Sequence, residues 1–276
     1  IVPYTRGPSR SLPIDAVSER IDRLAANGAA EIVLTGIHLG RYGLDQTPST
    51  SLFTLLRQIE VENRISRVRL SSIEPKELSD DIIQMAAQSP RICRHFHIPL
   101  QSGDKTVLDK MKRPYDAAFF KDLVWRIHDR IADAAIGVDV LAGFPGEDER
   151  AFANTYQLLA SLPITYLHVF PFSPRPQTPA SRYPNPVEPK VVKERCALLR
   201  QLSQDKKTAF YKSQLNRVTE VILEDRPDPA TGRSKGVSDN YLNVFTRTPK
   251  NYKNTCVKCR LTGPVFTNGT IAEIVD

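Results

Sequence analysis

Cysteine is scarce in this chain, and long apolar runs are missing. Four of the 276 residues are cysteine, too few for a disulfide-rich scaffold: Cys93, Cys196, Cys256 and Cys259. No stretch approaches the roughly 18 consecutive apolar residues that a membrane helix needs. We therefore expect no membrane span, and the low cysteine content suits the reducing cytoplasm.

The common phosphate-binding and Schiff-base signatures are also absent. There is no Walker loop, and Gly36, Gly40 and Gly43 do not have the spacing of the dinucleotide fingerprint. A Schiff-base aldolase needs a lysine on a barrel strand, and none of the five strands expected below carries one.

The residues that are present indicate an ordinary globular protein with an uneven distribution of charge. Hydrophobic residues make up 41% and charged residues 25%, and 276 residues suffice for roughly two domains. The formal net charge of +7 comes mostly from residues 175–212, which hold nine Lys and Arg against three Asp and Glu. Such a concentrated excess favours a polyanionic partner, although the same residues could form a solvated helix face.

Strand-like and helix-like patterns alternate over the first two thirds of the chain. Five short β-rich runs predict strands at 31–35, 68–71, 95–98, 136–141 and 166–170. Apolar residues at helical spacing separate them, at 17–24, 52–59, 79–85, 119–131 and 152–159. This alternation predicts an α/β fold with a parallel sheet or barrel.

The rhythm changes after residue 170. Seven prolines between 171 and 189 predict a loop or strap, and 191–211 reads as a long basic helix. Strand-like segments then follow at 218–223, 241–246, 257–261 and 270–275. We therefore predict two domains, an α/β domain over 1–211 and a small all-β barrel over 212–276.

Polar or glycine-bearing loops follow each of the five expected strands. In parallel α/β folds, chemistry takes place at the carboxyl ends of the strands. Glycines admit a ligand close to the backbone, and hydroxyl, amide and guanidinium groups suit a ribose and a carboxylate. Five such loops together favour a small-molecule site over simple turn chemistry.

Two other groups of residues could bind a metal ion. His95 and His97 are two apart on an expected strand and share a face, so with Asp139 and His168 they could support a metal-dependent hydrolase. The alternative, which we favour, is that they are hydrogen-bonded histidines without a metal. Cys256 and Cys259 have a metal-knuckle spacing, but no second pair exists, and residues three apart on a strand face opposite sides.

Six segments along the chain carry a resemblance to a known family. In order they are 1–7 (IVPYTRG), 35–43 (TGIHLGRYG), 69–75 (RLSSIEP), 97–103 (HIPLQSG), 143–147 (GFPGE) and 168–175 (HVFPFSPR). Together they resemble the radical S-adenosylmethionine methylthiotransferases. The SSIEP form resembles the branch that acts on threonylcarbamoyladenosine in tRNA, and the C-terminal module is similar to the RNA-binding TRAM barrel of these enzymes.

The resemblance implies a partial (β/α)6 radical-SAM barrel followed by an OB-like TRAM barrel, with S-adenosylmethionine as cofactor. In the family, a 4Fe–4S cluster on three cysteines binds the cofactor. Reductive cleavage gives a 5′-deoxyadenosyl radical, which abstracts the C2 hydrogen of the adenine next to the anticodon. A second cluster takes part in sulfur delivery. The implied partners are the tRNA anticodon stem-loop and a reductant such as flavodoxin or ferredoxin.

The resemblance also assigns cofactor-side residues by motif. They are Thr35, Gly36, Ser71, Ser72, Gln101, Ser102, Asp139, Gly143, Glu147 and Arg175. The residues expected to bind nucleic acid are Lys206, Lys207, Lys212, Tyr241, Lys250, Lys253, Lys258 and Arg260. Phe245 and Tyr252 are further stacking candidates, unless the aromatic side chains fill the core of the small barrel.

The chain departs from the family in two respects. It carries neither the three-cysteine loop nor the N-terminal cluster domain, so we expect it to be the part of a larger enzyme that begins just after the last cluster cysteine. Alone, it should bind no cluster, bind S-adenosylmethionine weakly and not catalyse. Gln177 stands where the family usually has glycine. A tRNA-binding module without catalysis and the metal-dependent hydrolase remain as alternatives.

Overall fold

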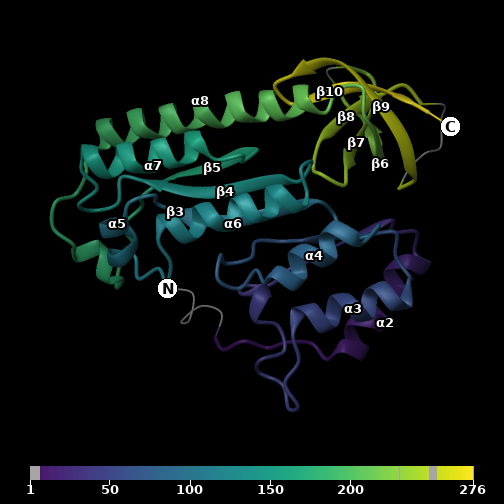
Figure 1. Cartoon of the computed structure of the whole chain (residues 1–276), viewed down its shortest axis with the longest axis horizontal. Coiled ribbons are helices and arrows are strands. Elements are labelled where there is room, and N and C mark those ends of the chain that lie inside the picture. Colours follow the sequence, from purple (N-terminus) through teal and green to yellow (C-terminus); the bar gives the residue numbers. More distant parts are fainter. Residues whose placement is uncertain (1–6, 230, 249–253, 276) are drawn as a thin grey trace.

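The computed structural model describes residues 7–229, 231–248 and 254–275 and contains an α/β part followed by a closed β-barrel (Figure 1). The five strands of the α/β part are β1 (Glu31–Leu34), β2 (Arg67–Leu70), β3 (His95–Gln101), β4 (Ala135–Ala142) and β5 (Tyr166–Pro171). Its helices are α2 (Ile14–Ala26), α3 (Leu52–Glu62), α4 (Asp80–Gln88), α5 (Lys105–Lys110), α6 (Ala117–Arg130), α7 (Glu149–Ser161) and α8 (Pro189–Ser213). The predicted strand–helix alternation is confirmed.

All strand pairs of the α/β part are parallel, but they form two sheets. One sheet pairs β1 with β2, and the other has the order β3-β4-β5. A parallel bridge between Val68 and Ile92 links β2 to the segment that enters β3. The carboxyl ends of the five strands therefore lie toward one end of the structure, as a small-molecule site in a parallel fold requires.

The helices begin where short polar side chains can cap them. Ser51, Ser79, Asp104, Asp116 and Asp148 each accept a hydrogen bond from the backbone N–H three residues later. Apolar faces of α2, α3, α4, α6 and α7 join the strands in one continuous core. The core fixes the strands, and the strands in turn fix the loops at their ends.

The C-terminal barrel closes with the strand order β10-β8-β7-β6-β9. Its strands are β6 (Val218–Pro227), β7 (Ser234–Ser238), β8 (Asn243–Thr246), β9 (Cys256–Phe266) and β10 (Gly269–Ile274). A second apolar core fills it, and Tyr211 of α8 belongs to this core. The boundary at residue 211 stays a prediction, because α8 continues to Ser213 and packs on both parts.

Three elements differ from the sequence-based expectation. The strand β7 was not predicted, because its sequence SKGVS has little apolar alternation. The helix α5 was also missed, since only Val107 and Leu108 of its six residues are buried. The proline-rich strap contains a short 3-10 turn, Pro179–Arg182, where only a loop was expected.

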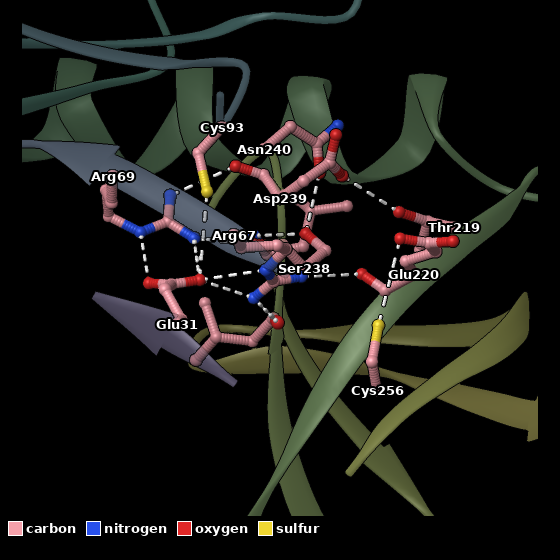
Figure 2. A network of polar contacts seen from close by, with 12 residues as sticks. Glu31, Arg67, Arg69, Cys93, Thr219, Glu220, Ser238, Asp239, Asn240 and Cys256 are labelled. Atoms are coloured by element: carbon pink, nitrogen blue, oxygen red, sulfur yellow. Dashed lines mark hydrogen bonds and ion pairs between the residues drawn. The ribbon is translucent and has the colours of Figure 1, made fainter. Parts of the chain in front are cut away.

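Two buried arginines of β2 join the α/β part to the small barrel (Figure 2). Arg67 donates to the backbone oxygens of Glu220 at 3.0 Å and Val237 at 2.9 Å. Arg69 donates to the backbone oxygens of Ser238 and Asp239, both at 3.0 Å. Both guanidinium groups also bind the carboxylate of Glu31 on β1. Because these donors are sequestered from water, the contact fixes the small barrel against the α/β part.

Candidate active site

The inward faces of β3, β4 and β5 bring three titratable side chains together. His97 Nε2 lies 2.7 Å from Asp139 Oδ1, and His168 Nδ1 lies 3.3 Å from the same oxygen. The other ring nitrogen of His97 lies 2.6 Å from Ser72 Oγ. One ligand atom from each of the three residues lies within 4.8 Å of the others, so the group could hold a metal ion.

The side chains of the same group also have hydrogen-bond partners without a metal ion. Burial raises the pKa of Asp139, but hydrogen bonds from His168 and His97 outweigh burial and hold it at about 2. Asp139 is therefore ionised at neutral pH and accepts from both imidazoles. The structure brings together three of the four residues that the sequence suggested as metal ligands. The fourth, His95, is not part of this group.

His95 lies two residues before His97 on β3 and has different neighbours. Its Nε2 lies 2.8 Å from the hydroxyl of Tyr166, and its ring stacks on Tyr241 with centroids 4.3 Å apart. Burial, together with the positive charge of Arg69, lowers the pKa of His95 well below its usual value. Neutral His95 therefore joins the α/β part to the loop before β8.

The glycine at position 137 allows this packing. A Cβ there would come within 2.3 Å of the Tyr166 ring, so any other residue would displace the ring from His95. Tyr166 was not singled out from the sequence. The signal that could have found it is its position two residues before His168 on the same strand face.

The loop after β2 carries two of the cofactor-side candidates. The backbone N–H of Ser71 donates to the backbone oxygen of Leu34, which ties the ends of β2 and β1 together. Ser71 Oγ is buried and has no hydrogen-bond partner among the described residues. An orphaned buried hydroxyl is costly, so it marks a place where a polar ligand group would be stabilising. Thr35 and Gly36 follow β1 on the exposed side of this end.

The loop after β3 is anchored by a buried side chain. Gln101 has φ 69°, in the left-handed region, where the register of β3 against β4 shifts. Ser102 is fully buried, with its hydroxyl 3.2 Å from that of Thr155 on α7. Gln101 is thus the half-buried residue of a strained turn, and the buried Ser102 holds the turn in position.

Glu147 supports the loop after β4 from the inside. Its carboxylate accepts from the backbone N–H of Gly143 at 3.0 Å and from Arg195 of α8 at 2.8 Å. Both charged side chains are less than a tenth exposed. Gly143 has φ 85°, and a Cβ there would lie 2.4 Å from Val192. Glu147 therefore shapes this loop, with Arg195 as the partner that sequence reasoning missed.

The last loop contains Arg175 and Gln177. Arg175 is exposed, and its backbone oxygen accepts from Thr178. Gln177 has φ 68°, so it adopts the left-handed conformation for which glycine is usual. The loop thus keeps a glycine-like backbone despite the substitution. A cavity of about 600 Å³ lies beneath this strap, lined mainly by prolines and by apolar residues of α8.

The residues expected to bind nucleic acid do not form one cluster. Lys206 donates to the backbone oxygens of Ala160 and Leu162, where it caps the end of α7. Lys207 lies half-buried beside Tyr211, with Nζ 5.8 Å from the ring centroid. The exposed positions are Lys212, Tyr241, Lys258 and Arg260.

Three of the remaining candidates, Lys250, Tyr252 and Lys253, lie outside the described residues. Phe245 is 1% exposed and its ring packs against Gly269, so its expected stacking on RNA is wrong. Val244, Phe245 and Thr246 of β8 are all buried, so both faces of this strand are covered.

The described cysteines do not form a cluster-binding group. Cys93 is buried against Glu31, Cys196 is buried on α8, and both remaining cysteines lie on β9. Cys259 faces the core and Cys256 the other side, as predicted from their spacing. The three-thiolate site of a 4Fe–4S cluster is thus not found among the residues that the structure describes. No described helix has the length and apolar character that crossing a membrane requires.

Comparison with known proteins supplies the family. The model of the Radical SAM superfamily matches residues 1–159. A threonylcarbamoyladenosine tRNA methylthiotransferase from Bacillus subtilis is 34% identical over 281 residues, which cover 100% of this chain and 62% of that protein. Its counterpart from Aquifex aeolicus is 33% identical over 88% of this chain and 57% of its own length.

A tRNA-2-methylthio-N(6)-dimethylallyladenosine synthase from Parafrankia is 37% identical over 86% of this chain and 48% of its own length. The chain thus spans about half the length of the curated relatives that it matches. On the family match and on this similarity to tRNA methylthiotransferases, the chain belongs to the Radical SAM superfamily.

Proposed function

We propose that the chain is the catalytic barrel and RNA-binding module of an enzyme that adds a methylthio group to C2 of N6-threonylcarbamoyladenosine in tRNA. The observation that carries the proposal is the similarity over the whole chain to a threonylcarbamoyladenosine tRNA methylthiotransferase. The dimethylallyladenosine synthases match almost as well, so the choice of branch rests on the SSIEP sequence after β2. A tRNA substrate also implies a cytoplasmic location.

The strand ends suit S-adenosylmethionine. The unpartnered Ser71 hydroxyl and the exposed backbone of Gly36 offer polar contacts without side-chain obstruction. The residues that would hold the cofactor directly are Thr35, Gly36, Ser71, Ser72, Gln101, Asp139, Gly143 and Arg175. Ser102 and Glu147 support the loops that carry them. Bound beside a reduced cluster, S-adenosylmethionine would supply the radical chemistry that removes the adenine C2 hydrogen.

The described cysteines do not fit the cluster itself, so no step is assigned to it within this chain. Two 4Fe–4S clusters and a reductant such as flavodoxin or ferredoxin belong to the proposal for the full-length enzyme. Within that proposal, the first part is a partial (β/α)6 barrel, and the closed β-barrel is a TRAM module that binds the tRNA.

The residues of the inward face would orient the substrate by fixed hydrogen bonds. Asp139 stays ionised and holds a proton on His97 Nε2 and on His168 Nδ1. When Nδ1 of His168 donates to Asp139, the other ring nitrogen can act as an acceptor, and the side chain is 50% exposed. An acceptor at this position can receive the N–H of a heterocycle without a change in protonation.

The test uses the full-length protein, purified and reconstituted without oxygen. It is incubated with S-adenosylmethionine, dithionite and tRNA that carries either threonylcarbamoyladenosine or dimethylallyladenosine, and the nucleosides are separated by mass spectrometry. We expect methylthiolation of threonylcarbamoyladenosine only. Modification of the dimethylallyl substrate alone would overturn the branch, and modification of neither would overturn the enzyme assignment.

A further inference from the structure

A cavity of about 280 Å³ lies between the edge strand β5, the C-terminal half of α8 and the loop that precedes β8. It shares His168 with the site described above and lies at the opposite end of β5 from the strand-end loops assigned to the cofactor. Three tyrosines line it, Tyr166, Tyr211 and Tyr241, together with Phe210. Its volume is slightly below the range of drug-sized sites, so it suits a single planar ring system.

The loop before β8 holds Tyr241 in a fixed position. Tyr241 has φ 66°, which is unfavourable for a residue with a side chain and marks functional positions in many proteins. The hydroxyl of Ser238 accepts from the backbone N–H of Leu242, and Asn240 donates to the backbone oxygen of Asp133 on the α/β part. The stack on His95 adds a third constraint, yet Tyr241 remains 47% exposed.

The cavity also carries polar groups of both hydrogen-bonding types. Gln204 and Asn243 contribute amides; each nitrogen already donates once, to Thr208 and to Asn268, and keeps a second N–H beside the amide oxygen. Lys207 contributes a cation, and no hydrogen bond or ion pair engages its ammonium among the described residues. The Watson–Crick edges of nucleobases require both donors and acceptors, and unstacked bases in RNA commonly lie on aromatic side chains.

The electrostatic surroundings favour RNA over an apolar ligand. The segment 175–212, which includes the wall of the cavity formed by α8, has nine basic and three acidic residues. Lys212 is exposed two residues beyond Phe210 at the end of α8, where this helix meets the small barrel (Figure 1). A phosphate backbone can follow such cations while one base turns into the protein.

We infer that this cavity receives one unstacked nucleobase of the RNA substrate, with Tyr241 as its stacking platform and Gln204, Asn243 and Lys207 at its edge. The inference rests on the proposed function, since it requires an RNA ligand. It places a second RNA contact away from the strand ends where the modified adenine would react. The contact would hold the RNA in register while its reactive base occupies the other end.

The test is a coupling experiment with the 276-residue chain. An anticodon stem-loop RNA is prepared with abasic substitutions, one at each unpaired position, and its affinity is measured by fluorescence anisotropy for wild type and Tyr241→Ala. We expect one abasic position to weaken binding to wild type by about fivefold or more, the scale of a lost base–aromatic stack. The same substitution should have no effect on binding to Tyr241→Ala. Phe266→Ala, an aromatic residue 41% exposed on β9 outside the cavity, is the matched control and should keep the wild-type pattern.

A second variant guards against disturbance of the His95 stack. Gln204→Ala, on the exposed flank of α8, should reduce the loss at the same RNA position without changing the circular dichroism spectrum. If RNA binds but no position is coupled to Tyr241 or Gln204, the nucleobase site is wrong and the proposed function stands. If the wild-type chain binds no RNA even at low salt, both this inference and the assignment of the RNA-binding module fail.

Discussion

Tyr241 of the loop before β8 stacks on His95 of β3, with centroids 4.3 Å apart and ring planes inclined by 22°. The guanidinium of Arg69 lies 5.1 Å from the centroid of the same tyrosine ring. A residue of the small barrel therefore completes the packing on this face of the α/β part. Because the charged neighbour and the burial both act on His95, this contact links the stability of the interface to pH.

The stability of the chain should depend on His95 between pH 7.5 and 5.5. Its folded pKa is depressed, so the unfolded chain binds a proton near pH 6.5 that the folded chain does not. The free energy of unfolding therefore falls as the pH drops below 6.5, by up to about 1.4 kcal/mol per pH unit from this group. Urea unfolding of His95→Gln should show a shallower decline. His128→Gln, on the outer helix α6, should decline as wild type does, and equal slopes in all three proteins would contradict the account.

Arg67 should be essential to the contact between the two parts. Its side chain is 3% exposed and donates to two backbone oxygens of the small barrel and to Glu31. Arg67→Met removes these hydrogen bonds and leaves Glu31 with Arg69 as its remaining partner, and losing one partner of a buried ion pair costs about 3–5 kcal/mol. Urea unfolding measures the loss. Arg64→Met, with a side chain 47% exposed, should cost less than about 1 kcal/mol, as surface pairs do. Similar losses in both variants would refute the buried network.

Arg195 should be equally necessary for the loop at the end of β4. Arg195→Met leaves the buried carboxylate of Glu147 with only the N–H of Gly143, so we expect a loss of about 3 kcal/mol or more. The double variant Arg195→Met with Glu147→Gln removes the stranded charge and should recover part of it. Arg200→Met, exposed on the same helix, is the control for lost helix propensity and charge. If thermal unfolding shows that Arg200→Met is as destabilising as Arg195→Met, this role of Arg195 is contradicted.

The 276-residue chain should not assemble a 4Fe–4S cluster. Burial raises the pKa of Cys93 to about 12 and that of Cys259 to about 11, so neither thiol ionises readily. Cluster ligands must be thiolates, and these cysteines lie on separate elements. Anaerobic reconstitution followed by iron and sulfide analysis should give far less than one cluster per chain. Stoichiometric iron and sulfide with the visible absorption of a cluster would overturn this expectation.

Local patterns predicted most of the fold but only part of the site. Apolar periodicity located the five strands of the α/β part, because each contributes residues to one core. Residues two apart on one strand also predicted that His95 and His97 would share a face, but only His97 contacts Asp139, whereas His95 bonds Tyr166. The pairs Tyr241–His95 and Arg195–Glu147 could not be predicted this way, because each joins distant segments whose encounter depends on the complete packing. Phe245 was expected to stack on RNA but is buried. Nothing in the local sequence distinguishes a core aromatic residue on a strand from a surface one.

RNA binding should weaken as the salt concentration rises. Exposed lysines at the end of α8 and on the small barrel should account for part of the slope of log K against log salt. Lys212 and Lys258 are exposed, whereas Lys206 is engaged by the end of α7. Each phosphate contact releases about one counterion, so Lys212→Gln with Lys258→Gln should lower the slope of log K against log salt by about 2. Lys206→Gln should instead lower stability and leave the slope nearly unchanged. Anisotropy titrations of an anticodon stem-loop between 50 and 200 mM salt, about the range over which such slopes are read, provide the measurement. If Lys212→Gln with Lys258→Gln leaves the slope unchanged but Lys206→Gln changes it, the RNA runs along the flank of α7 and not along the small barrel.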